Sequence, residues 1–222
     1  GVEEFHVKLW TSIYQSSFSG ISKIYLEGYS ISQGLKVEGS IKLIFDSVSK
    51  VNWYLSILDS SYAEVRNKMV VWGTTNVNGG PITFRTDSHV QYLPISNVNW
   101  DSLLYSDEDS LVEILLGAQL DLNGGGMSSG VWNIEQFSWF DIGEYQFNDT
   151  SVINSLGYFR PDGGTIRILT PSTHFYEIYP IYTTTIQTPF NLTTQKLYIY
   201  SVLNIETLGE GSIYCIIEEG HT

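Results

Sequence analysis

Residues 35–46 read Leu-Lys-Val-Glu-Gly-Ser-Ile-Lys-Leu-Ile-Phe-Asp, and side-chain character alternates along this stretch. The odd-numbered positions from Leu35 to Phe45 are apolar or glycine. The even-numbered positions are polar or charged, with Ile44 as the exception. A period of two is typical of a strand that buries one face, as strands of antiparallel sheets do. The stretch therefore predicts a half-buried antiparallel strand.

The same alternation continues outward along the chain. Residues 196–205 repeat it, and turn clusters such as 76–81, 123–126 and 161–164 separate the shorter runs. The further strands that we expect span 5–10, 21–27, 51–58, 69–75, 82–86, 89–93, 130–135, 137–142, 164–169, 175–182 and 212–218. Many short strands with frequent turns predict an all-β antiparallel β-sandwich or jelly roll. No repeat of fixed short period is evident, so we do not expect a solenoid or a propeller.

Two segments carry signals of a helix start. Ser106 precedes three acidic residues and an apolar run that Gly117 can end. Ser61 and Glu64 form a capping-box pattern that runs to about Lys68. We expect one short helix in each segment, within an otherwise all-β fold.

Charge divides the chain near residue 97. Residues 1–99 contain eight acidic and eight basic residues, whereas residues 100–222 contain sixteen acidic and three basic ones. We expect two stacked sandwich or jelly-roll domains, residues 1–97 and 98–222; a single elaborated jelly roll fits the periodicity equally well. Crowded carboxylates have raised pKa values, so we also expect acid to stabilise the second half.

Composition excludes several partners. The net charge of −13 disfavours nucleic acid and anionic membranes, and no apolar run is long enough for a membrane-spanning helix. Ser, Thr, Asn and Gln number 63 of the 222 residues, against 35 charged ones. Such a surface changes little with pH and favours an extracellular protein. Cys215 is the single cysteine and has the setting of a buried, inert thiol.

A search for catalytic motifs assigns no catalytic, cofactor-binding or metal-binding residue and no cofactor. The chain has no Gly-x-Ser-x-Gly, no phosphate-binding Gly-x-x-x-x-Gly-Lys and no dinucleotide-binding Gly-x-Gly-x-x-Gly after a strand. The four histidines have no paired metal-ligand spacing; they are His6, His89, His174 and His221. We therefore do not expect an enzyme.

Carboxylates leave two alternatives open. A jelly-roll glycoside hydrolase needs two of them across a groove, and strand-like runs offer Glu135, Asp141, Glu177 and Glu206, with Trp132, Trp139, Tyr176 and Tyr179 to stack sugars. The acids Asp107, Asp109 and Glu113 do not have EF-hand spacing, and Asp121 with Asn123 does not either. A structural calcium near Asp121 or Asp162 stays open, as does glycosylation at the sequons of Asn148 and Asn191.

The strands rich in Ser, Thr, Asn, Tyr and Ile, the single cysteine and segments such as 178–185 (IYPIYTTT) resemble virion and surface proteins of thermoacidophilic archaea. Within that group, the length and β-content are similar to a vertex or turret protein of a turreted icosahedral virus. The resemblance implies a capsid subunit of stacked jelly rolls, located in the virion or on an extracellular surface, and transfers no functional residue.

The surplus of aromatic residues favours subunit interfaces. We expect self-association into a symmetric ring, such as a pentamer, together with other structural proteins of the same assembly. The alternatives are a carbohydrate-binding or glycoside-hydrolysing jelly roll and an S-layer or pilus-like subunit. In the latter, the run 4–10 completes a neighbour's sheet.

Overall fold

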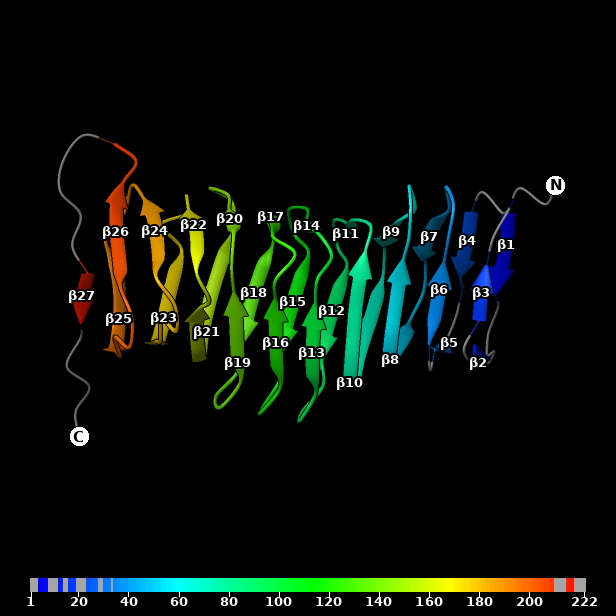
Figure 1. Cartoon of the computed structure of the whole chain (residues 1–222), viewed down its shortest axis with the longest axis horizontal. Coiled ribbons are helices and arrows are strands. Elements are labelled where there is room, and N and C mark those ends of the chain that lie inside the picture. Colours follow the sequence, from blue (N-terminus) through cyan, green and yellow to red (C-terminus); the bar gives the residue numbers. More distant parts are fainter. Residues whose placement is uncertain are drawn as a thin grey trace.

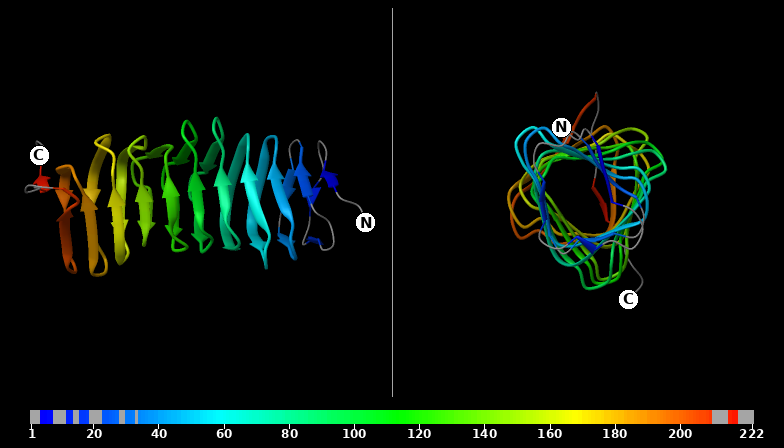
Figure 2. Two further views of the ribbon diagram at one scale, coloured as in Figure 1. Left: turned by 90° about the horizontal axis from the view of Figure 1, so that it is seen from above. Right: turned by 90° about the vertical axis from the view of Figure 1, so that its right-hand side faces the viewer.

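The computed structural model describes residues 4–7, 12–13, 16–18, 23–27, 30–32, 34–209 and 215–217. All strand pairs in this part of the chain are parallel, and the strands stack along one long axis as a β-solenoid (Figure 1). Seen along that axis, successive coils superpose around a common centre (Figure 2). One coil spans about twenty residues: Ile82 pairs with Ala63 in the preceding coil and with Leu104 in the following one.

An eleven-stranded sheet forms one side of the solenoid, which we call face A. Its strands are β1 (Glu4–Val7), β4 (Lys23–Leu26), β7 (Lys42–Phe45), β9 (Tyr62–Val65), β11 (Ile82–Phe84), β14 (Leu104–Ser106), β17 (Gly126–Ser128), β20 (Tyr145–Phe147), β22 (Gly164–Ile168), β24 (Thr184–Thr188) and β26 (Leu203–Thr207).

A sixteen-stranded sheet folds around the other sides and divides into faces B and C. Face B contains β2 (Ser12–Ile13), β5 (Ser30–Ser32), β12 (His89–Tyr92), β15 (Leu111–Ile114), β18 (Val131–Ile134) and β27 (Cys215–Ile217). Face C contains β3 (Ser16–Phe18), β6 (Leu35–Val37), β13 (Asn97–Trp100), β16 (Gln119–Leu122) and β19 (Trp139–Ile142). Long strands cross both faces: β8 (Ser49–Ile57), β10 (Lys68–Gly79), β21 (Val152–Pro161), β23 (Thr173–Ile178) and β25 (Leu192–Leu197).

Strand β10 shows how one strand serves two faces. Its first part, Lys68–Val71, pairs with β12 on face B, and its second part, Thr74–Val77, pairs with β13 on face C. Gly73 lies between the two parts with a φ of +69°, and the pairing with β8 shifts register there. A bend at this point turns the chain from one face to the next.

The core fills the space between the faces as one continuous hydrophobic cluster. Each strand points alternate residues inward, so Ile82 stacks on Leu104 in the next coil, and Tyr145 stacks on Ile166 in the same way further along the axis. Trp132 is fully buried in this cluster and stacks on Phe140, with ring centroids 5.0 Å apart. Burying large aromatic side chains in this way stabilises the stack through the hydrophobic effect.

The expected antiparallel sandwich or jelly roll is wrong, and so is the exclusion of a solenoid. Most expected strands exist, but each pairs in parallel with its equivalent in the next coil rather than with its sequence neighbour. The stretch 35–46 is also two strands, β6 and β7, which lie on different faces with Gly39 between them at a φ of +107°. The ladder β10–β13–β16 runs through residue 97, so two sandwiches do not meet there.

Both expected helices are wrong as well. Tyr62–Val65 forms β9, and the segment after Ser106 forms a turn followed by β15. The described residues contain no helix. The acidic residues that suggested a helix start at Asp107–Asp109 instead occupy a tight turn between faces A and B, in which the Ser110 backbone N–H donates to the Asp107 carbonyl.

Candidate functional site

An apolar ridge runs along the corner between faces B and C. It consists of one exposed large hydrophobic side chain from each of six successive coils, namely Trp53, Trp72, Ile95, Leu116, Phe137 and Leu156. The strands on both sides of this corner pair in register, so these residues follow one another along the axis. With neighbouring strands about 4.8 Å apart, the ridge is about 24 Å long.

The corner between faces A and B has the same turn geometry but the opposite chemistry. The backbone N–H of Ser88 donates to the Arg85 carbonyl on that corner, and the N–H of Ser96 donates to the Leu93 carbonyl on the ridge. The turns on the polar corner are Arg-Thr-Asp-Ser and Asp-Glu-Asp-Ser, whereas those on the ridge are Leu-Pro-Ile-Ser and Leu-Leu-Gly-Ala. The fold itself therefore does not require apolar residues at these turns.

Three ridge residues have backbone conformations that their side chains disfavour, and one of them is Trp53 with a φ of +91°. Ile95 has a φ of +64° with 86% of its surface exposed, and Phe137 has a φ of +61° with 58% exposed. Asp87 and Asp109 occupy the equivalent position on the polar corner. A left-handed φ is costly for a β-branched residue and suits Asp, Asn or Gly better. Because these side chains are exposed, burial in the described fold does not offset this cost.

An acidic cluster on face C surrounds Asp141. Asp121, Asp141 and Arg160 occupy matching positions on β16, β19 and β21, and Asp141 is only 6% exposed. Burial raises the pKa of Asp141 to about 8, and a hydrogen bond with Asp121 adds to the effect. The Arg160 Nε lies 3.0 Å from Oδ1 of Asp141 and opposes the rise, although the contact is poorly aligned for a hydrogen bond. The raised pKa favours the protonated form of Asp141 far more than an ordinary aspartate would at the same pH.

The structure does not bring the other candidate acids to Asp141 as a catalytic pair. Glu135 accepts a hydrogen bond from the Leu116 backbone at the ridge, Glu177 pairs with Lys196 at 2.9 Å, and Glu206 on face A accepts from Gln187. Each carboxylate already has a structural partner. Two acids facing each other across a sugar-sized groove, which glycoside hydrolysis requires, are not found among the described residues.

The four candidate sugar-stacking residues also have different positions. Trp132 is a core residue, so its proposed role as a platform is wrong. Trp139 stacks on Tyr158 at 4.1 Å and lies under Arg160, and Tyr179 packs on Tyr200 at 4.7 Å. Tyr176 lies 4.8 Å beneath the Lys196 ammonium. The ring contacts of these three residues are with the protein's own side chains.

Several other candidates have ordinary structural roles. His89 contacts Glu113 on face B, His6 lies 2.6 Å from Glu27, and Asn148 donates to Ser129. His221 lies outside the described residues, as do positions 8–10 of the expected first strand. Among the described residues no three His, Cys, Asp or Glu side chains are grouped to hold a metal ion, including those near Asp121 and Asp162.

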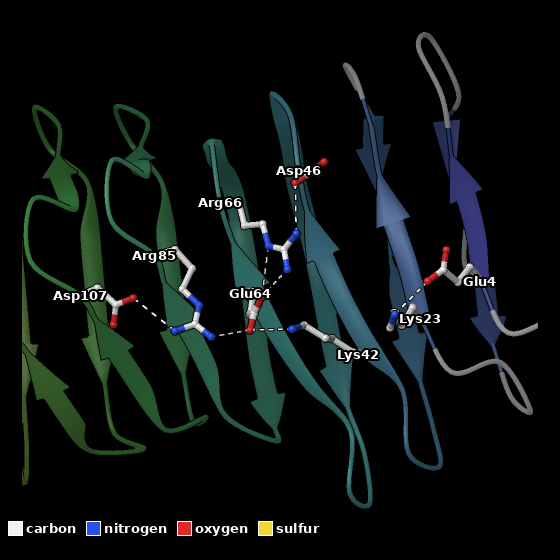
Figure 3. Close-up of polar contacts among 8 residues, drawn as sticks. All are labelled: Glu4, Lys23, Lys42, Asp46, Glu64, Arg66, Arg85 and Asp107. Carbon is white, nitrogen blue, oxygen red and sulfur yellow. Dashed lines mark hydrogen bonds and ion pairs between the residues drawn. The ribbon is translucent and has the colours of Figure 1, made fainter.

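Sequence reasoning did not anticipate a charged cluster around Glu64 on face A (Figure 3). The Glu64 side chain is almost fully covered and contacts Lys42 at 2.8 Å, Arg66 at 3.0 Å and Arg85 at 2.6 Å. Arg85 continues to Asp107 at 3.3 Å, so the cluster spans several coils. Burial opposes ionisation of Glu64, but hydrogen bonds from Lys42, Arg85 and Arg66 outweigh it and lower its pKa to about 2.

Changing Glu64→Gln should therefore weaken the N-terminal coils. We expect a loss of about 2 kcal/mol in the free energy of unfolding at pH 7, because three cations lose their common negative charge and one of its two acceptor oxygens becomes an amide nitrogen. The pKa of Glu64 is about 2 in the folded protein and about 4.3 in the unfolded chain. The stability that ionised Glu64 contributes is therefore fully present above about pH 4.3 and is lost as the pH falls towards 2. The deficit of the variant should thus shrink below pH 4 in urea denaturation. The exposed Glu38, which pairs with the likewise exposed Lys36, provides the control Glu38→Gln with less than about 0.5 kcal/mol of loss.

Comparison with protein-family models, curated proteins and solved structures finds no match to this chain. The turret-protein resemblance assumed stacked jelly rolls, which the solenoid replaces, so a viral identity has no support. The part of the chain that the structure describes contains no helix able to cross a membrane.

Proposed function

We propose that this protein is a structural subunit of an extracellular assembly, in which copies associate side by side through the apolar ridge. The observation that carries the proposal is the row of exposed apolar residues, two of them at strained turn positions where the equivalent corner has aspartate. Large contiguous apolar surfaces on soluble proteins mark interaction sites.

The charge distribution supports a second copy of this chain as the partner. The net charge of −13 makes copies repel one another over most of the surface, whereas the ridge turns contain a single charged residue, Glu135. Glu135 is itself held by the Leu116 backbone N–H at 2.9 Å. Two ridges can therefore approach without opposing clusters of like charge. Interface cores are typically depleted of charged residues in this way.

The direction of the ridge supports a symmetric ring. Because it runs parallel to the solenoid axis, several copies with parallel axes can place their ridges around one central axis. Every copy then contributes the same residues to the contact, as in closed cyclic assemblies. The surface rich in uncharged polar groups suits an extracellular location.

Oligomeric state tests the proposal directly. We expect wild-type protein to be oligomeric by size exclusion with light scattering at about 100 µM. Changing Ile95, Leu116 and Phe137 to serine should give monomers, with association weakened at least about 30-fold, since central apolar contacts carry most interface energy.

A matched control uses Tyr182, Ile199 and Tyr200, three similarly exposed apolar residues near the last coils. Changing these three to serine should leave the oligomer intact. A wild-type monomer, or a control variant that dissociates as readily as the ridge variant, would contradict the proposed ridge contact. Circular dichroism establishes that both variants keep their β-structure.

A further inference from the structure

A groove crosses face A at the glycine run that follows Asn123. It has a volume of about 570 Å³ and lies over successive coils, with Leu103, Gly125, Glu144 and Thr165 along one line and Met127, Gln146 and Arg167 along the next. Four strands separated by about 4.8 Å give it a length of about 14 Å. We call it the glycine groove.

The floor of the groove depends on Gly125. Its φ is +73°, and a Cβ at this position would lie 2.8 Å from the Glu144 carbonyl oxygen. The outward line that carries Leu103 and Glu144 in the adjacent coils therefore has no side chain here. The gap in that line opens the surface between Met127 on one side and Glu144 on the other.

Hydrogen bonds hold the Arg167 guanidinium in an orientation suited to binding an anion in this groove. Its Nε donates to Oε1 of Gln187 at 3.0 Å, and the Gln187 amide donates in turn to Glu206 at 2.9 Å. Glu206 thus orients the amide so that its oxygen faces Arg167. Within the described part of the chain Arg167 has no ion pair, although residues 100–222 contain sixteen acids and three bases. Its terminal nitrogens keep the fork geometry that matches a carboxylate.

The other groups in the groove fit a hydroxylated ligand. Glu144 and Gln146 supply acceptors, since the Gln146 amide nitrogen already donates to Asn148 at 2.8 Å; Thr165 supplies a donor, and Met127 and Leu103 supply apolar surface. A peptide strand has no free edge to pair with, because β14, β17, β20 and β22 are each paired on both sides. The net charge of −13 also repels a polyanion.

We infer that the glycine groove binds a glycan that carries an isolated carboxylate, a uronate within an otherwise neutral chain, with Arg167 holding the carboxylate. Glu144 and Gln146 accept hydrogen bonds from the sugar hydroxyls. The site is separate from the ridge and does not rest on the proposed assembly.

Cellobiouronic acid, a glucuronate joined to glucose, is a suitable probe in isothermal titration calorimetry. We expect it to bind the wild type at least tenfold more tightly than cellobiose or acetate. Arg167→Gln should weaken binding at least tenfold, and Arg167→Lys should weaken it less, because the charge remains without the fork. The exposed Lys36 lies on face C, so Lys36→Gln matches the charge change and should leave binding unchanged.

Three results would overturn the inference. They are the absence of binding to wild-type protein, equal binding of acetate, and binding that survives Arg167→Gln. Tighter binding of a short peptide carboxylate at Arg167 would replace the glycan with a chain terminus as ligand. Circular dichroism of each variant separates lost binding from lost folding.

Discussion

Changing Gly79→Ala is expected to lower the free energy of unfolding by about 4 kcal/mol, since overpacking against backbone adds to the cost of a left-handed φ. Gly79 has a φ of +101° and pairs with Ile57 in the preceding coil. A Cβ on Gly79 would lie 1.7 Å from the Ile57 carbonyl oxygen, which is backbone and cannot rotate away. Two adjacent coils must therefore separate locally.

Gly39 provides a control with nearly the same backbone conformation. Its φ is +107°, but a Cβ there would meet no atom within 4 Å. Gly39→Ala should cost only about 1–2 kcal/mol, the conformational part alone. Urea denaturation of both variants measures the difference. Equal losses would mean that the coils do not approach each other as closely at Gly79 as the solenoid requires.

The second large effect concerns Asp141. The Asp141→Asn variant should be more stable than the wild type at pH 9 by about 3 kcal/mol, and nearly equal to it at pH 4. The raised pKa of about 8 means that the folded protein keeps a proton which the unfolded chain releases near pH 4. Wild-type stability from this group is therefore full at low pH and falls as the pH rises through 4 to 8. Asparagine has no proton to lose.

The surroundings of Asp141 set the size of this effect. Asp121 and Asp162 disfavour its ionisation, whereas Arg160 favours it. Unfolding curves between pH 4 and 9 measure the difference, with Glu108→Gln as an exposed control that removes one acidic charge elsewhere. If the variant and the wild type kept parallel pH profiles, Asp141 would not be the buried acid described above.

This result bears on the expectation that acid stabilises residues 98–222. Asp141 and Asp162 have raised pKa values and act in that direction. Glu113 acts in the opposite direction, because hydrogen bonds from Gln91 and His89 outweigh its burial and lower its pKa. The effect therefore comes from particular buried positions rather than from the charge count, and the melting comparison at pH 4 and 7.5 stays a prediction.

Strand positions could be predicted from the sequence, whereas strand pairing could not. Alternation reports that one face of a strand is buried, and β12, β18 and β22 were expected within a few residues. It does not report whether the partner is the neighbour in sequence or the equivalent strand one coil away. The sequence pattern also joins short strands such as Leu35–Val37 to the strand that follows, because the alternation of apolar and polar residues continues through the bend at Gly39.

A signal for the solenoid does exist at the corners. Ser96, Ala118 and Ser138 each follow a tight turn and precede a face C strand, at intervals of 22 and 20 residues. Small residues fit these three positions because their side chains are buried, next to the exposed ridge residues. Because the intervals differ and Ala replaces Ser at one position, a search for a repeat of fixed period does not detect these corners. The ridge could not be recognised without the repeat, since Ile95, Leu116 and Phe137 become one surface only when the coils are stacked.

Coil-by-coil stacking also determines how the molecule would respond to a mechanical load. β1 and β26 lie at opposite ends of the long axis (Figure 1), and the hydrogen bonds between coils run along that axis. Tension applied from end to end would separate neighbouring coils one after another, rather than break the hydrogen bonds of many coils at the same time. Each step would release a coil of about 20 residues, or about 70 Å of extended chain. A fibre built from such subunits would yield gradually under force instead of breaking at one threshold.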